Sequence, residues 1–160
     1  MNKTIMLSNF TDLTLDEKKM ILSWRNNPTV KKWMYTQDDI SLENHLKFIE
    51  QLLGKKDKVY FLVKQHSQNI GIIDFNNITL DRVDMGIYTN PDKKGVGKIL
   101  LETIIDYSFE VLKVKTIYAE VFAENNKAHG LYKKYSFEEV NRKEVINKEV
   151  ICMELKNENR

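Results

Sequence analysis

The spacing of hydrophobic and polar positions divides the chain into segments with helical and strand periodicity. Apolar residues three and four positions apart predict helices over about 15–26, from position 41 onward, for about four turns after position 97, and over about 126–135. Runs of β-branched and aromatic residues predict seven strands, at 5–10, 59–64, 69–75, 82–88, 116–122, 137–145 and 149–155. The order βααβββαβαββ predicts an α/β fold with a mixed sheet.

Local signals refine this outline. The sequence TLDE at 14–17 is a capping box, which predicts a helix start. The strands from 59 to 88 predict an antiparallel meander, and the crossover helix predicts that strands 83–88 and 116–122 lie side by side and parallel. The helix beginning at Ser41 carries one apolar stripe at 42, 46, 49 and 53 and another at 45, 48 and 52. Either one stripe packs on the sheet while the other borders a pocket, or the helix is buried widely.

Composition narrows the class of protein. A chain of 160 residues with a net charge of +2 and no long single-sign run predicts one domain over residues 1–160 that binds small molecules rather than nucleic acid or membrane. Because the sequence has neither an apolar stretch of roughly 18 residues nor the pattern of a signal peptide, we expect a cytoplasmic protein. The single cysteine, Cys152, is predicted to be a buried strand residue, so no disulfide or cysteine-based zinc site forms within the chain.

The segment NPDKKGVGKILL at 90–101 is the first candidate site. Gly95 and Gly97 lie directly before an amphipathic helix, with Lys93, Lys94 and Lys98 beside them. Such a junction binds phosphate, since glycines let consecutive N–H groups point into one hollow and the helix start adds roughly half a positive charge. Taken alone, the two glycines favour a simple tight turn over a phosphate site.

A second motif, NNKAHGLYKKYSF at 125–137, gives the first motif a context. Its pattern Asn-x-x-Ala-x-x-x-Tyr, followed by a small residue and Phe about thirty residues after a Gly-x-Gly helix start, resembles the acetyl-CoA-dependent N-acetyltransferases of the GNAT superfamily. The resemblance implies the GNAT fold, a central mixed and mostly antiparallel twisted sheet flanked by about four helices. It implies acetyl-CoA as co-substrate and no metal.

The resemblance also assigns cofactor contacts. The amides of Lys94, Gly95, Val96, Gly97 and Lys98 would hold the CoA pyrophosphate, with Lys93 adding positive potential. The sequence departs from the family at Asp92, where Gln or Arg is usual, and at Ser136, where Gly is common. Further implied contacts come from the strand backbone at Met85 and Ile87, which Gly86 lets the pantetheine arm approach, and from Asn125, Ala128 and Tyr132. The alternative for Asn125 is an ordinary cap of the helix amides, and both roles are compatible.

Two residues are candidates for proton transfer. Tyr132 matches the family tyrosine that protonates the CoA thiolate, although a packing role between helix and sheet is the alternative. The attacking amine must lose a proton, and Glu120 on strand 116–122 is the predicted acceptor, directly or through water, because it shares a face with Tyr118 and Phe122. The alternative for Glu120 is an ordinary solvent-facing carboxylate.

The first third of the chain carries a finer resemblance. The segments WRNNP at 24–28, WMY at 33–35 and the helix after Ser41 resemble the bacterial enzymes that acetylate the 4-amine of UDP-4-amino-4,6-dideoxy-N-acetyl-β-L-altrosamine in pseudaminic acid biosynthesis, which supplies a flagellin glycan. For a nucleotide sugar, Arg25 and His45 would bind the diphosphate, and the predicted apolar contacts are Met34, Tyr35, Phe48 and Tyr88. Arg25 could instead favour a helix C-terminus, and the apolar residues could be core.

Other functions stay open at this point. WRN-x-P also occurs in RimJ/RimL-like protein N-terminal acetyltransferases, and a polyamine N-acetyltransferase would use the same cofactor. A cation-binding enzyme of that kind favours an acidic pocket, whereas Arg25 and His45 are basic. A nucleotide-binding or regulatory module without catalysis is the rival from another class, which intact Asn125 and Tyr132 oppose. The sequence leaves the oligomeric state open between a monomer and a homodimer.

Overall fold

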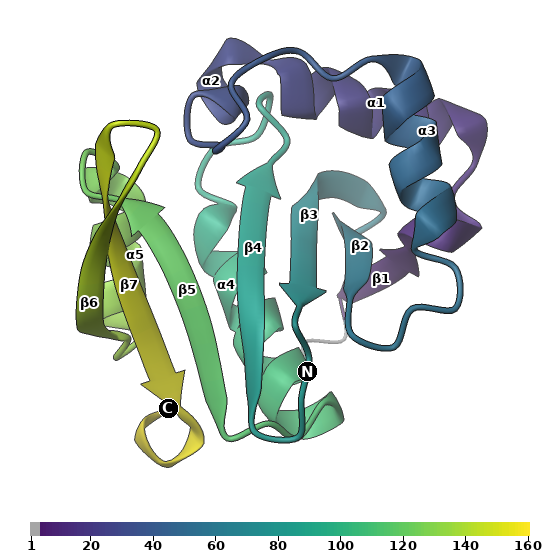
Figure 1. Cartoon of the computed structure of the whole chain (residues 1–160). Helices are drawn as coiled ribbons and strands as arrows, with labels where there is room; N and C mark the ends of the chain where they lie inside the picture. The colour runs from purple at the N-terminus through teal and green to yellow at the C-terminus, as the bar shows by residue number, and fades with distance from the viewer. Residues whose placement is uncertain (1–3) are drawn as a thin grey trace.

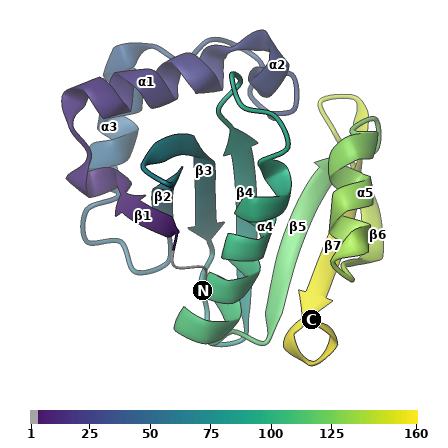
Figure 2. The same ribbon diagram turned by 180° about the vertical axis from the view of Figure 1, so that it is seen from behind.

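A seven-stranded sheet runs through the computed structural model, which describes residues 4–160 (Figures 1 and 2). The strand order is β1-β2-β3-β4-β5-β7-β6, and every neighbouring pair is antiparallel except β4 and β5. The strands are β1 (Ile5–Asn9), β2 (Val59–Gln65), β3 (Gln68–Asn76), β4 (Arg82–Thr89), β5 (Thr116–Phe122), β6 (Glu138–Val145) and β7 (Lys148–Lys156). The predicted fold class and the antiparallel meander β2-β3-β4 are therefore confirmed.

Residues 4–160 form five α-helices, four of which cover the two faces of the sheet. They are α1 (Leu15–Asn26), α2 (Pro28–Lys31), α3 (Leu42–Gln51), α4 (Gly97–Asp106) and α5 (Asn126–Lys134). Helices α1 and α3 lie on one face, which we call the front, and α4 and α5 lie on the back (Figures 1 and 2). No helix within residues 4–160 is both long and apolar enough to cross a membrane.

The capping chemistry explains where the helices begin. Thr14 Oγ1 accepts from Glu17 N at 3.1 Å while Glu17 Oε1 accepts from Thr14 N at 3.0 Å, so the predicted capping box is confirmed. The short helix α2 lies outside the predicted elements, because the sequence pattern ends one helix near residue 26 and begins the next at residue 41. Proline is well suited to the first turn of a helix, and Asn27 caps that turn through Thr29 N.

Two hydrophobic clusters hold the layers together. On the back, α4 buries Leu100, Leu101 and Ile104 against the sheet, and the π-helical turn at Tyr107–Val111 that continues this helix buries Ser108. On the front, α3 buries His45, Ile49 and Leu52, whereas Leu42, Phe48 and Leu53 are exposed. The buried side of α3 thus takes residues from both predicted stripes, and wide burial of the helix is not observed.

The contact between β4 and β5 is much shorter than predicted. Only Arg82, Val83 and Asp84 pair with Thr116, Ile117 and Tyr118. Each strand is paired along nearly its whole length with its other neighbour, β3 or β7, so the twist of the two half-sheets separates them beyond this point. We call this divergence, visible in Figure 1 between β4 and β5, the splay. The prediction that strands 83–88 and 116–122 lie side by side and parallel is therefore confirmed, although the paired stretch ends at Asp84 and Tyr118.

Candidate active site

The start of α4 differs from the starts of the other described α-helices. The other four α-helices begin with a side chain that caps a backbone amide, from Thr14, Asn27, Ser41 or Asn125. In contrast, α4 has Val96 at the capping position and no side-chain cap. Its first amides therefore have no partner within the helix and can bind the oxygens of a phosphate group.

The two glycines of this loop have different structural roles. Gly95 has a φ of +74°, a conformation that favours glycine, and a Cβ built on it meets no atom within 4 Å. A Cβ on Gly97 would lie 3.5 Å from Leu131 of α5, which shows how closely α4 and α5 approach. The turn itself lies earlier, where Asn90 accepts from Asp92 N and Lys93 N. The loop at 94–98 is therefore open and compatible with the predicted contact to the CoA pyrophosphate, which stays a prediction.

Charged side chains around this loop are arranged unevenly. Lys94 and Lys98 are exposed, whereas Lys93 Nζ donates to Gln68 Oε1 at 2.5 Å, so its predicted phosphate contact requires it to leave that partner. The Asp92 side chain is exposed. The departure from the family pattern thus places a solvated carboxylate in the turn before the glycines, rather than a buried charge beside them.

Helix α5 places Tyr132 behind the splay. Asn125 caps the helix by accepting from Ala128 N at 3.2 Å, as the alternative to a purely cofactor-binding role predicted. Tyr132 is 7% exposed, and its ring packs against Phe137 with centroids 5.6 Å apart. Burial, together with the charge of Asp74, raises the pKa of Tyr132 to about 12. Met85 and Ile87 of β4 pack against the same back cluster, so the predicted cofactor residues gather on this side.

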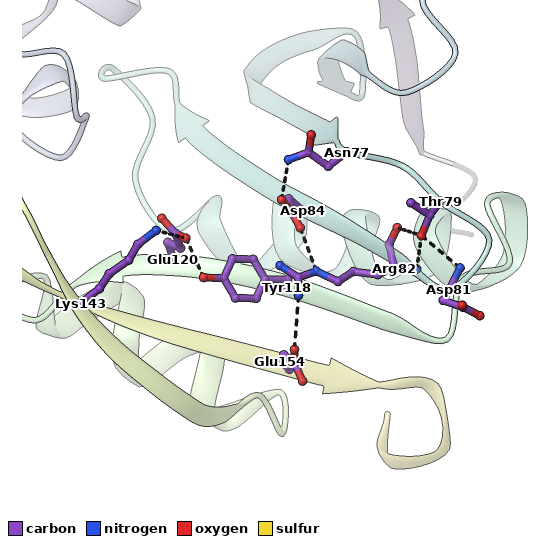
Figure 3. Close-up of polar contacts among 9 residues, drawn as sticks. All are labelled: Asn77, Thr79, Asp81, Arg82, Asp84, Tyr118, Glu120, Lys143 and Glu154. Carbon is purple, nitrogen blue, oxygen red and sulfur yellow. Dashed lines mark hydrogen bonds and ion pairs between the residues drawn. The ribbon is translucent and has the colours of Figure 1, made fainter.

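Glu120 lies on β5 at the front of the sheet, in a network of donors. Lys143 Nζ is 2.8 Å from Glu120 Oε2, the Tyr118 hydroxyl donates to the same oxygen at 2.6 Å, and Tyr35 donates to Oε1 (Figure 3 shows the first two). Burial raises the pKa of Glu120, but the hydrogen bonds from Lys143, Tyr118 and Tyr35 outweigh it and lower the pKa overall. This environment opposes the predicted role of Glu120 as proton acceptor.

Asp74 of β3 is a half-buried carboxylate that the sequence interpretation missed. It lies opposite Gly86 of β4 and accepts from Asn76 Nδ2 at 2.8 Å. Burial raises the pKa of Asp74 to about 7, which the Asn76 hydrogen bond only partly offsets. An acidic residue within the apolar run of a central strand was the signal that could have found it.

The predicted substrate residues fall into two groups. Arg25, in the last turn of α1, donates from Nη2 to Thr36 O at 3.1 Å, while its Nη1 is buried without a partner. Burial lowers the pKa of Arg25, and nearby Tyr88 raises it. Tyr88 lies on the front of β4 against the cluster beneath α1 and α3. Arg25 and Tyr88 are therefore brought together, as the substrate prediction requires.

The remaining substrate candidates have structural partners. His45 is 5% exposed and its Nε2 lies 2.8 Å from Lys18 O, a contact that joins α3 to α1 and opposes the predicted diphosphate contact. Phe48 packs edge-on against Tyr60, and Tyr35 packs edge-on against Phe122 while it contacts Glu120. Met34 is half-buried. Of this group, Tyr35 is the residue that reaches the splay from the front.

The fold, the splay and the uncapped α4 define an acetyltransferase, and comparison with known proteins gives its family. The model of the acetyltransferase (GNAT) domain matches residues 6–138, so the chain belongs to the GNAT acetyltransferase family, and acetyl-CoA is its co-substrate. The chain is 47% identical to acetyltransferase PseH of Campylobacter jejuni over 133 residues, which are 83% of this chain and 84% of that protein.

Solved structures agree with this assignment. The crystal structure of Campylobacter jejuni N-acetyltransferase PseH in complex with acetyl coenzyme A has a TM-score of 0.80 and 38% identity, covering 96% of this chain and 99% of that one. Spermidine N-acetyltransferase from Vibrio cholerae, in complex with CoA and spermine, has a TM-score of 0.88 at 22% identity and covers 99% of this chain and 98% of its own. At that identity the second likeness concerns the fold alone.

Proposed function

We propose that this protein transfers the acetyl group of acetyl-CoA to the 4-amine of UDP-4-amino-4,6-dideoxy-N-acetyl-β-L-altrosamine, by direct attack of the amine on the thioester. The reaction belongs to pseudaminic acid biosynthesis and supplies a precursor of the flagellin glycan. The enzyme acts in the cytoplasm on small molecules, as a single domain over residues 1–160, and its assembly is a homodimer. The likeness to the Campylobacter acetyltransferase covers 96% of this chain and so includes its first third, where the predicted substrate residues lie. This likeness supports the choice of substrate.

The observation that carries the proposal is that Nη1 of Arg25 is buried without a hydrogen-bond partner among the described residues. A buried N–H without an acceptor is costly, and a diphosphate supplies acceptors that match the planar guanidinium. Tyr88 beside Arg25 provides an aromatic surface for the sugar or base. A guanidinium at this place attracts a nucleotide sugar and repels a polyamine.

The cofactor residues bind two parts of acetyl-CoA and protonate its sulfur. The amides at 94–98 bind the pyrophosphate, and the free edge of β4 beyond Asp84 offers backbone groups at Met85 and Ile87 to the pantetheine arm. Tyr132 gives its hydroxyl proton to the CoA sulfur as the C–S bond breaks. Its raised pKa keeps the phenol protonated until that moment.

The competing activities share a single test. Purified protein is given acetyl-CoA and, in separate reactions, the UDP-amino sugar, spermidine and peptides with free amino termini, and the released thiol is measured. We expect turnover with the UDP-amino sugar to exceed the others by at least 100-fold in kcat/KM. Faster turnover with spermidine or a peptide would refute the sugar assignment, and no turnover with any amine would favour a binding module.

A variant locates the diphosphate. Arg25→Ala should raise the KM for the sugar nucleotide by about 10-fold and leave the KM for acetyl-CoA unchanged, because a charge-assisted hydrogen bond contributes roughly 1.5–3 kcal/mol. The control is Arg142→Ala, which removes an exposed arginine of β6 that pairs with Glu139. An equal rise in the KM values for both substrates would show that Arg25 does not bind the sugar nucleotide in the acceptor pocket.

A further inference from the structure

The carboxylate of Asp74 occupies a place that the sheet leaves open for it. A Cβ built on the opposite residue, Gly86, would lie 2.4 Å from both carboxylate oxygens, far inside contact distance. Gly86 therefore creates the space in which Asp74 lies over β4. From the sequence, Gly86 was expected to let the pantetheine arm approach β4. In the structure, the side chain that approaches Gly86 closely is Asp74.

This place lies at the splay. Asp84 is the last residue of β4 that pairs with β5, and Gly86 is two residues further along the same face. Asp74 is consequently beside the first stretch of β4 whose far edge has no strand partner, where the thioester must lie if β4 binds the pantetheine arm. The influence of Asp74 on the pKa of Tyr132 indicates that the two groups approach this point from opposite faces.

The neighbours of Asp74 leave the carboxylate without a cation. Asn76 is its one hydrogen-bond partner among the described residues, and no lysine, arginine or histidine in that part of the chain forms an ion pair with it. The titratable and charged groups that face this region are Tyr60 of β2, Asp84 and Tyr88 of β4, Arg25 of α1 and Tyr132 of α5. Asp84 is itself occupied by Arg82 and Asn77 (Figure 3).

We propose that Asp74, rather than Glu120, accepts the proton from the attacking amine. As the C–N bond forms, the nitrogen loses a proton to the Asp74 carboxylate, and as the C–S bond breaks, Tyr132 donates its proton to sulfur. The proton on Asp74 then returns to the Tyr132 phenolate, which balances the cycle. A carboxyl group with a pKa near 7 is ionised in a useful fraction at neutral pH and holds a proton far better than an exposed one.

The inference rests on acetylation of an amine, as proposed above, but does not depend on which amine. The test is Asp74→Asn, which keeps the shape and the acceptor for Asn76 but cannot take a proton. We expect kcat to fall by roughly 10²- to 10³-fold, the KM for acetyl-CoA to stay unchanged, and the acidic limb of the kcat/KM profile near pH 7 to disappear. Asp84→Asn is the matched control on the same face and should keep both rate and limb.

Three outcomes decide the proposal. An Asp74→Asn enzyme that keeps the acidic limb would overturn it, as would a Glu120→Gln enzyme that loses the limb. Independently of any substrate, infrared titration of the carboxyl groups in the CoA-bound protein should show a group with a midpoint near pH 7 that is absent from Asp74→Asn. Absence of that group from the wild type would also overturn the proposal. If the UDP-amino sugar is not a substrate, the same profiles are recorded with the amine that is.

Discussion

Asp74 and Glu120 lie on the same face of the sheet, on opposite sides of the splay, in contrasting environments. Glu120 has two close tyrosine hydroxyls and an ion pair with Lys143, so its negative charge is well stabilised. Within residues 4–160, Asp74 has one amide donor and no cation partner, so burial dominates its pKa. Proximity to the reacting centre therefore does not by itself make a carboxylate a base, because the surrounding donors decide whether it can take a proton.

The largest expected effect comes from Tyr132, the proposed proton donor to the CoA sulfur. Its role is the same whether Asp74 or Glu120 accepts the proton of the amine. Tyr132→Phe removes only the hydroxyl and keeps the ring that packs on Phe137. We expect kcat to fall by roughly 10²- to 10³-fold without a change in acetyl-CoA binding, measured by steady-state kinetics and by CoA calorimetry. If kcat is unchanged while chemistry limits turnover, Tyr132 is a packing residue only.

The second prediction disturbs the Asp74 side alone. Gly86→Ala places a methyl group where the carboxylate lies, so Asp74 must move. We expect kcat to fall by about fifty-fold while acetyl-CoA still binds. A rise in the KM for acetyl-CoA with little change in kcat would instead show that Gly86 is needed for the approach of the pantetheine arm. Gly130→Ala on α5, where a Cβ meets no atom within 4 Å, is the control.

The third prediction concerns stability rather than rate. The pKa of Asp74 is raised by folding, so between about pH 4 and pH 7 the native protein binds more protons at this site than the unfolded chain does, and stability falls as pH rises. Asp74→Asn removes this loss. Relative to the wild type, the variant should gain roughly 3–4 kcal/mol in free energy of unfolding between pH 4 and pH 8. Urea denaturation across this range measures the difference, and parallel curves would contradict it.

The smallest effect is expected on the Glu120 side. Lys143→Ala removes the strongest of the donors that lower the pKa of Glu120, so that pKa should rise. Because Glu120 is not the proton acceptor in our proposal, kcat/KM should change by less than about 3-fold, and the acidic limb should stay where it is. A shift of the limb in this variant would show that Glu120 controls the proton after all.

Sequence reasoning succeeded where the signal is local. The capping box at Thr14, the Gly-x-Gly start of α4 and the Asn125 cap each depend on residues within one helical turn. The order of helices and strands along the chain followed from short apolar runs and turn residues. These features need only the period of the pattern and the chemistry of neighbouring positions, which the sequence contains directly.

It failed where the answer depends on residues that are distant in the chain. The length of the β4–β5 contact depends on how β3 and β7 twist the half-sheets apart, which no local pattern records. Asp74 acquires its environment from Gly86, on another strand, and Glu120 acquires its donors from Tyr35 and Lys143. His45 is buried through a contact with the backbone of α1. In each case a partner on another element determines the chemistry.

The uncapped start of α4 also has a consequence for the lifetime of the protein. A helix whose first amides are completed only by a bound phosphate is less stable in the free enzyme than in the loaded one. Ligand that binds the folded chain alone raises its stability by about 2.7 kcal/mol at a concentration one hundred times its Kd. Unfolding and proteolysis should therefore slow when acetyl-CoA is plentiful, so that the abundance of this enzyme follows the metabolic supply of its own acetyl donor.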